Sequence, residues 1–406
     1  MLKRIVFFVV AVICFVLPLS ASDITTVFNV KALLGQYAFE KESGSYNGNL
    51  NIDFVPAIKF SDKFSLLPAF YLGYNGVKDV TELVGGGTLV QQSADYNIAL
   101  KPIINLSKNV KLRAKVGYMN QLFQETTDET WGKGLFDYNK VTAGADISHK
   151  NITAGYSCYT IVFPNYNTLA ETETKEKYGS ELSSSSVGKK ILDFSASEIS
   201  AYGKIYPLDS FVIDWSFGYN LKSFADQKVI TEIVNVYKPE NRADNSIAVS
   251  VFPSIALIPA GPVTLLGGLN VSMINYNSTQ NHYNVKATSQ DNPYTPKYYD
   301  YSETQIAPVV SCSFNTIPLK VDLSYQMGSR KYTERLAQDS AGTNLADKTK
   351  TDTNYLSLGL TYPLFEKMSL KMLVSQFNSV SNMKYEQVYR YNYTTSNYFV
   401  GVTYEY

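Results

Sequence analysis

Charged side chains that recur at alternate positions are the residues of this sequence best suited to chemistry. Lys111, Arg113 and Lys115 form the densest group, and Lys101 lies a short distance before them. Alternate residues of a β-strand point to the same side of a sheet, so these cations would share one face. Positive side chains gathered on the wall of a narrow water-filled passage bias it towards anions.

The other charged residues expected on this face carry both signs. The full set of candidates for a polar, solute-facing wall is Asp53, Lys59, Lys101, Lys111, Arg113, Lys115, Lys140, Asp146, Lys204, Asp214, Lys320, Asp322 and Lys371. Two interpretations of the basic cluster stay open. Its members attract anionic solutes, or they pair with acidic neighbours such as Asp53, Asp95 and Asp146 or face water outside a membrane.

Groups suited to catalysis are scarce. The chain has 2 histidines, His149 and His282. A catalytic histidine needs a partner held at hydrogen-bond distance, and Ser278, Asp291 and Asp300 accompany His282 only within an expected flexible loop. We interpret His282 as a solvated loop residue, and we predict no enzyme activity, no catalytic residues and no cofactor.

The cysteines lack the close spacing of a metal site. Cys158 and Cys312 each fall on the apolar positions of an alternating segment, next in phase to Tyr156 and Val310. We interpret both as small lipid-facing residues that do not form a disulfide. We therefore predict no metal site.

The segments that must position these side chains have a period of two residues. From Asn49 to Phe60 the even positions are apolar, and after a polar turn at Ser61 the same alternation resumes and continues to Tyr74. A two-residue period indicates a strand with one apolar face. Two such strands around a tight turn predict a β-hairpin.

This hairpin recurs along the chain. Pro56 lies five residues before Ser61, and Pro102 lies five residues before Ser107. Further copies turn near residues 149–151, 207–210, 259–262, 315–316 and 365–367. Such repetition predicts one architecture built of hairpins. Within it we interpret Gly35 as a bulge and place the strand prolines near a membrane boundary.

Short turns alternate with long polar segments. The long segments are 165–190, 225–243, 277–302, 331–353 and 379–396. Outer-membrane barrels have short periplasmic turns and long extracellular loops. We predict an all-β fold, a single transmembrane antiparallel β-barrel of about 16 strands, within a range of about 14–18.

The first residues are expected to form a secretory signal peptide. Lys3 and Arg4 precede an apolar run from Ile5 to Leu17, and small residues follow up to Ser22. This run of about 13 residues is shorter than the ~20 that cross a bilayer as a helix. We predict a signal peptide at 1–22 and a barrel at 23–406.

Composition argues against one class of function and favours a membrane boundary. The chain carries 36 basic and 36 acidic side chains, so it offers no general positive surface for nucleic acid. Aromatic residues make up 14% of the chain, and 32 of them are Tyr. Tyrosine suits a boundary between hydrocarbon and water.

The chain ends in an alternating segment. Its apolar positions are Tyr398, Val400, Val402, Tyr404 and Tyr406. Together with the signal and the strand–turn repeats, the terminal Val-Thr-Tyr-Glu-Tyr resembles bacterial outer-membrane β-barrel proteins of the general porin class. In that class, an alternating last strand that ends on an aromatic residue is the recognition signal for the barrel-assembly machinery.

The resemblance implies a place in the Gram-negative outer membrane, with both termini periplasmic and with membrane lipid and the assembly machinery as partners. A barrel of about 16 strands encloses water, so we predict a porin-like channel for passive passage of small hydrophilic solutes, with a weak preference for anions. A surface structural or adhesion barrel with an occluded lumen and a hydrophobic-ligand transporter stay open as alternatives. Homo-oligomerisation also stays open.

Overall fold

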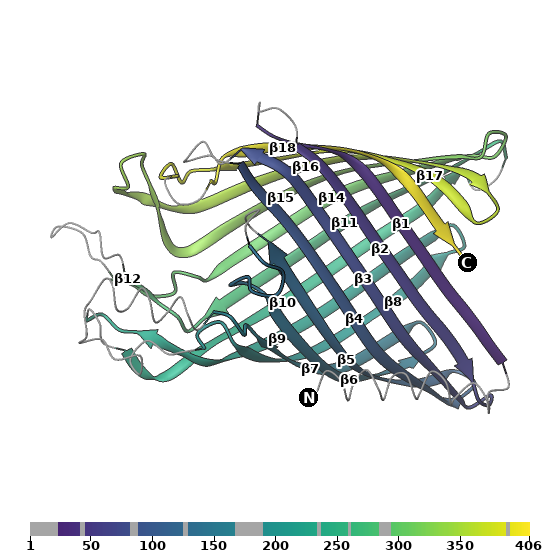
Figure 1. Cartoon of the computed structure of the whole chain (residues 1–406), viewed down its shortest axis with the longest axis horizontal. Coiled ribbons are helices and arrows are strands. Elements are labelled where there is room, and N and C mark those ends of the chain that lie inside the picture. The colour runs from purple at the N-terminus through teal and green to yellow at the C-terminus, as the bar shows by residue number, and fades with distance from the viewer. Residues whose placement is uncertain are drawn as a thin grey trace.

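The computed structural model describes residues 23–40, 45–81, 88–124, 129–166, 190–233, 237–258, 261–283, 294–386 and 390–406. Sixteen strands in these ranges form one closed antiparallel barrel. The first strand, β1 (Asp23–Phe39), pairs with the last, β18 (Tyr393–Glu405), and closes the sheet (Figure 1). The predicted fold class and strand number are confirmed. The expected signal peptide at 1–22 lies outside the described residues.

Between these two strands the chain passes up and down the barrel wall. The first half contains β2 (Ser45–Lys59), β3 (Phe64–Thr81), β4 (Thr88–Ser107), β5 (Val110–Gln124), β6 (Tyr138–His149), β7 (Ile152–Val162), β8 (Phe194–Leu208) and β9 (Phe211–Ile230). The second half contains β10 (Tyr237–Ile258), β11 (Val263–Ser278), β14 (Tyr301–Phe314), β15 (Leu319–Gln338), β16 (Asn344–Phe365) and β17 (Met368–Ser381). Two short strands, β12 (His282–Tyr283) and β13 (Tyr294–Thr295), pair only with each other.

The outer face of the barrel is apolar, as the alternation predicted. Phe54, Leu72, Val116 and Val400 are among the large hydrophobic side chains left exposed on it. Closure pairs the backbone groups of each strand with both neighbours, so hydrocarbon could surround the wall without meeting an open edge. Within the described ranges, no helix is long and apolar enough to cross a membrane.

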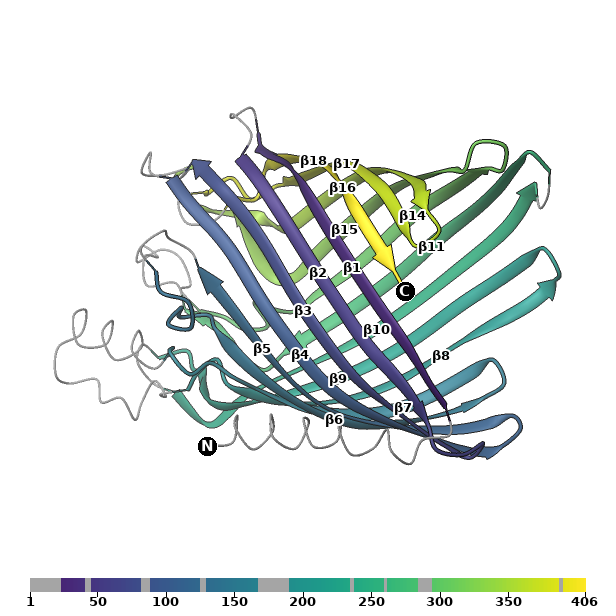
Figure 2. The same cartoon turned by 45° about the vertical axis from the view of Figure 1, so that its right-hand side comes forward.

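The two ends of the barrel differ. Short connections at residues 60–63, 108–109, 150–151, 209–210, 315–318 and 366–367 define the short-turn end. The opposite end, here called the long-loop end, carries the described segments 129–137, 279–281 and 296–300 between its strands (Figure 2). Asp23 pairs with Lys59 next to a short turn, and Tyr406 exchanges backbone hydrogen bonds with Phe28. Both Asp23 and Tyr406 therefore lie towards the short-turn end.

Several strands are longer than predicted at the long-loop end. The segments 225–243 and 331–353 were expected to be loops, but β9 continues to Ile230 and β15 continues to Gln338. The paired residues there include Lys331 opposite Lys350. Both faces of such an extension can meet water, so no apolar alternation distinguishes it from a loop.

Prolines interrupt the ladder without changing its register. The β2–β3 pairing stops at Phe54 opposite Phe70 and resumes in the same register at Ile58 opposite Leu66, with Pro56 and Pro68 in the gap. The corresponding gaps occur at Pro102, Pro253 and Pro308. A proline lacks the donor for one ladder bond. Each interruption affects the pairing with one neighbouring strand only. The strand order and the face on which each side chain lies are therefore preserved.

Gly35 does not form a bulge, which corrects the prediction. The pairing of β1 with β2 and with β18 runs through Gly35 without a shift. A Cβ on Gly35 would overlap the carbonyl oxygen of Tyr398 and lie 2.8 Å from the Cα of Phe399. Gly401 is similarly crowded, since its Cβ would lie 2.7 Å from the Cα of Leu33. Glycine is required here by the close approach of the first and last strands.

Candidate functional site: the lumen wall and its long-loop mouth

The predicted basic cluster faces the lumen, and one of its members is neutralised. Arg113 lies opposite Asp146 in the β5–β6 ladder, and its Nε is 2.6 Å from Asp146 Oδ1. Its Nη2 also donates to Tyr202 Oη at 3.0 Å. For Arg113, the interpretation that it pairs with an acidic neighbour is confirmed.

Other lumen candidates are also paired. Lys204 lies 3.0 Å from Asp214, and Lys320 lies 3.0 Å from Asp322. Lys59 pairs with Asp62 at the short-turn end, at 2.7 Å. Asp53 lies between Asn29 and Tyr71 in the ladder. Most of the mixed charges on this face therefore neutralise one another locally.

Three lysines of the basic cluster differ from Arg113. Lys101, Lys111 and Lys115 form no ion pair among the residues that the structure describes. Lys115 lies opposite Gly144, and Lys111 lies opposite Ser148, so neither faces a carboxylate across the β5–β6 ladder. The expected partner Asp95 is buried, and a Cβ on the neighbouring Gly73 would lie against its carboxylate. This part of the wall keeps an excess of positive charge.

The apolar residues of the closing strand lie on the outer face. Tyr398 and Val400 are half exposed, and Val400, Val402 and Tyr404 pair in register with Leu34, Ala32 and Val30 of β1. Cys158 is exposed and Cys312 is partly exposed, and neither forms a disulfide. An apolar outside, a closed sheet and a polar inside are now established. The chain is a β-barrel of the transmembrane type.

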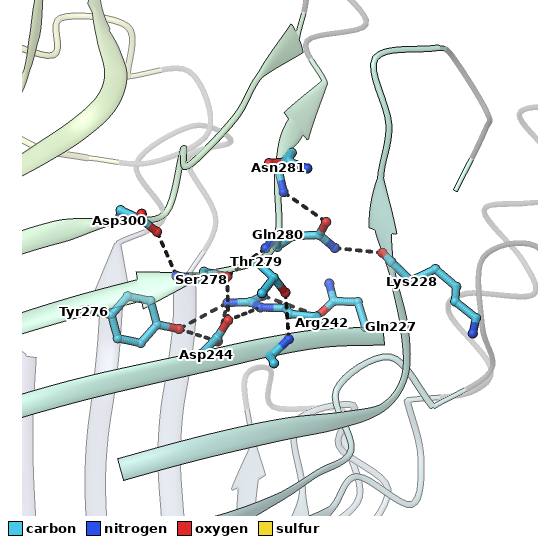
Figure 3. Close-up of polar contacts among 11 residues, drawn as sticks. Gln227, Lys228, Arg242, Asp244, Tyr276, Ser278, Thr279, Gln280, Asn281 and Asp300 are labelled. Atoms are coloured by element: carbon cyan, nitrogen blue, oxygen red, sulfur yellow. Dashed lines mark hydrogen bonds and ion pairs between the residues drawn. The ribbon is translucent and has the colours of Figure 1, made fainter. Parts of the chain in front are cut away.

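A buried polar cluster braces the mouth of this barrel at the long-loop end. Asp244 of β10 is 1% exposed. Arg242 donates hydrogen bonds to both carboxylate oxygens of Asp244, from Nε to Oδ1 at 2.8 Å and from Nη2 to Oδ2 at 2.7 Å. The hydroxyls of Tyr276 and Ser278 on β11 donate to the same carboxylate (Figure 3). A buried charge is stable only when paired and fully hydrogen-bonded, and this carboxylate meets both conditions.

The cluster extends into the loop that follows β11. The Gln280 side chain accepts from the backbone N–H of Ile230 at 2.9 Å and donates to the Lys228 carbonyl at 3.0 Å. Asn281 Nδ2 donates to the Ile230 carbonyl at 2.9 Å. These bonds fasten the loop to the end of β9 (Figure 3). They fix the position of β12 beside the mouth.

An aspartate followed by an aromatic residue begins three strands at this end. Asp137 precedes β6, Asp193 precedes β8 and Asp300 precedes β14. Their carboxylates accept from backbone N–H groups at or just after the end of the preceding strand. The donors are Phe123, Phe163 and Ser278, at 2.7, 2.8 and 2.7 Å. Burial raises the pKa of all three carboxyls, and the backbone hydrogen bonds oppose that rise. The sequence signal for these residues is an Asp directly before Tyr or Phe at the start of a strand.

Aromatic side chains on the inner face ring the mouth, and these were also missed. Tyr276 stacks on Tyr301 with centroids 5.1 Å apart, and Phe194 lies 5.5 Å from Phe224. Arginines lie over several rings, such as Arg242 over Phe224 at 4.5 Å and Arg330 over Tyr301 at 4.4 Å. The abundance of tyrosine predicts side chains at a boundary between hydrocarbon and water. Part of it lines the inside.

His282 is not the solvated loop residue that was expected. Its ring stacks on Tyr298 at 4.2 Å, and Arg335 lies over the same tyrosine at 4.9 Å. Burial and the positive charge of Arg335 lower the pKa of His282. Of its expected partners, Asp291 lies outside the described residues and Asp300 accepts from the Ser278 backbone. Within the described ranges, no group of three His, Cys, Asp or Glu side chains could hold a metal ion.

Comparison with known proteins adds little to this description. No protein-family model and no curated protein matches the sequence. The solved structures that align with it include OmpT of Vibrio cholerae (11% identity, TM-score 0.46, covering 95% of this chain and 98% of that one). OccK2 of Pseudomonas aeruginosa (10%, 0.44, 95% and 98%) and its OpdK with vanillate (8%, 0.46, 94% and 99%) also align. These similarities are too low to carry an argument about function.

Proposed function

We propose that this barrel is an outer-membrane channel for the passive passage of small hydrophilic solutes. The observation that carries the proposal is the inner face of a closed 16-strand wall, which presents charged and hydroxyl side chains where a packed core would present apolar ones. Barrels of about 8 strands fill with side chains, whereas 16–18 strands leave room for water.

A weak preference for anions is the finer part of the proposal. It rests on Lys101, Lys111 and Lys115, which form no ion pair among the described residues, while Arg113 is neutralised by Asp146. An excess of fixed positive charge on one wall attracts anions by an amount that salt screens. The preference should therefore be visible at low ionic strength and small at high ionic strength.

The two unlike ends of the barrel support a proposed orientation in the outer membrane. Outer-membrane barrels keep short turns in the periplasm, so the short-turn end, with Asp23 and Tyr406, would face the periplasm. The outward alternation of β18 suits recognition by the barrel-assembly machinery. Lipid of the outer membrane would cover the apolar belt.

Swelling of liposomes that contain the refolded protein tests this function. Neutral solutes of increasing size should enter at rates that fall with size, and protein-free liposomes should not swell. A barrel that is shown to be folded by heat-modifiable gel mobility but admits no solute would contradict the channel. That outcome would favour a barrel with an occluded lumen, whose loops act at the cell surface.

A further inference from the structure

A recess of about 320 Å³ is cut into the inner wall at the long-loop end, across β14–β18. Its lining includes Arg330, Tyr332, Phe377, Arg390 and Tyr393. The volume is at the lower end of the ~300–1,000 Å³ typical of small-molecule sites. The lumen function proposed above assigns no role to this recess.

Two small residues of one ladder row, Thr353 and Ser379, lie in the floor of the recess. Gly328 lies opposite Thr353, Thr353 lies opposite Ser379, and Ser379 lies opposite Tyr393. A Cβ on Gly328 would lie against the hydroxyl of Thr353. Thr353 and Ser379 therefore present short hydroxyl side chains to the recess, with larger side chains on either side.

One side of the recess is aromatic. Phe377 and Tyr393 lie 5.7 Å apart at an interplanar angle of 40°, and Phe39 stacks on Tyr393 at 5.6 Å. These contacts hold the two rings in place, so their exposed faces form a fixed apolar surface. Rigid aromatic faces bind a flat apolar surface with little loss of side-chain entropy.

The other side is polar, and its charges are already satisfied. Arg330 Nε donates to Glu303 Oε2 at 2.7 Å, and Gln305 donates to the second oxygen of Glu303 at 2.6 Å. Arg390 pairs with Glu386 at 3.3 Å. Because both arginines are paired, the recess offers hydrogen-bonding groups without an uncompensated cation.

We infer that the recess is a binding subsite for a neutral saccharide of one to three rings. A sugar ring has an apolar C–H face and an edge of hydroxyls, and it therefore matches an aromatic side facing a neutral polar side. A carboxylate ligand would instead require a free cation, and both arginines that line the recess are neutralised. The inference rests on the proposed channel function only for how the sugar reaches the recess.

Titration calorimetry on the refolded full-length protein in detergent tests the inference without requiring conduction. The probes are glucose, maltose and maltotriose, with glucuronate as the charged comparison. Binding of at least one neutral probe, more tightly than glucuronate, is the expected result. Absence of heat with all three neutral probes, or tighter binding of glucuronate, would overturn the inference.

Two phenylalanines provide a matched pair of variants. Phe377→Ala removes an aromatic face of the recess and should weaken binding of the neutral probe by roughly tenfold. Phe194→Ala removes a lumen-facing phenylalanine that lies against Tyr159 at 6.2 Å on another part of the wall, and should leave binding unchanged. Equal losses in the two variants would overturn the placement of the site. A barrel that binds the sugar but passes no solute would refute the channel and leave the subsite standing.

Discussion

Gly35 and Tyr398 meet at the seam where the barrel closes. The backbone of β1 approaches β18 so closely there that a Cβ on Gly35 would overlap the Tyr398 carbonyl oxygen. The register on both sides of Gly35 is unbroken. The seam between the two ends of the chain thus depends on a residue without a side chain.

Gly35→Ala should therefore impair closure of the barrel. The new methyl group must displace the backbone of β18, because no flexible side chain is there to yield. We expect a clear loss of the heat-modifiable folded form after refolding. Gly218→Ala on β9 is the matched control, since a Cβ there meets nothing within 4 Å, and normal folding of both variants would refute the steric argument.

Removing unpaired lysines should change ion selectivity, and removing a paired charge should not. Lys101→Gln with Lys115→Gln lowers the positive charge of the lumen wall, so the reversal potential in a salt gradient should shift towards cation preference. Arg113→Gln with Asp146→Asn removes an ion pair of no net charge and should leave it nearly unchanged. An unaltered reversal potential in the lysine variant would exclude this cluster as the source of selectivity.

Asp244→Ala should destabilise the long-loop end strongly. It leaves Arg242, whose side chain is 16% exposed, as a buried charge without its partner. Breaking a buried pair from one side costs about 3–5 kcal/mol, to be measured by urea unfolding in detergent micelles. The comparison is Asp352→Ala, which breaks an exposed pair with Lys350 (46% and 45% exposed) and should cost about 0–1 kcal/mol. Similar losses in both variants would mean that the buried cluster does not brace the mouth.

Acidic pH should loosen the loop that carries His282. The pKa of His282 is lowered from the unfolded value of 6.5, so below pH 6.5 the unfolded loop binds more protons than the packed one. The stability due to the neutral ring is present above pH 6.5 and is lost as pH falls through the lowered pKa. The protection factors of the backbone amides at residues 294–301, which correct for the slower intrinsic exchange at acidic pH, should fall between pH 7.5 and pH 5. His282→Phe keeps a ring on Tyr298 and should abolish the pH dependence. An equal fall in the protection factors of that variant would place the titrating group elsewhere.

Much of the barrel was predictable because every strand in contact with lipid needs an apolar outer face. Phe54, Leu72 and Val116 alternate with polar residues whether or not anything is known of their neighbours. Strand number followed from counting turns. The charge pairs were harder to predict, because Arg113 meets Asp146 only once the register of β5 against β6 is fixed.

The long-loop mouth was poorly predicted for a different physical reason. The strands at this end extend beyond the apolar belt of the barrel. Hydrogen bonds and buried polar contacts stabilise them there, and such contacts produce no periodic pattern in the sequence. Asp244 and Gln280 look like ordinary loop residues in the sequence, yet both are buried. The prediction of a bulge at Gly35 was wrong, because the role of this glycine is steric and depends on β18, a strand far away in the sequence.

Conductance of the refolded protein in a planar lipid bilayer tests the central proposal most directly. A water-filled 16-strand barrel should insert in discrete steps and hold open at low voltage, with a conductance that scales with the salt concentration. A protein that shows heat-modifiable folding but inserts without any conductance step would contradict the account of this barrel as a channel.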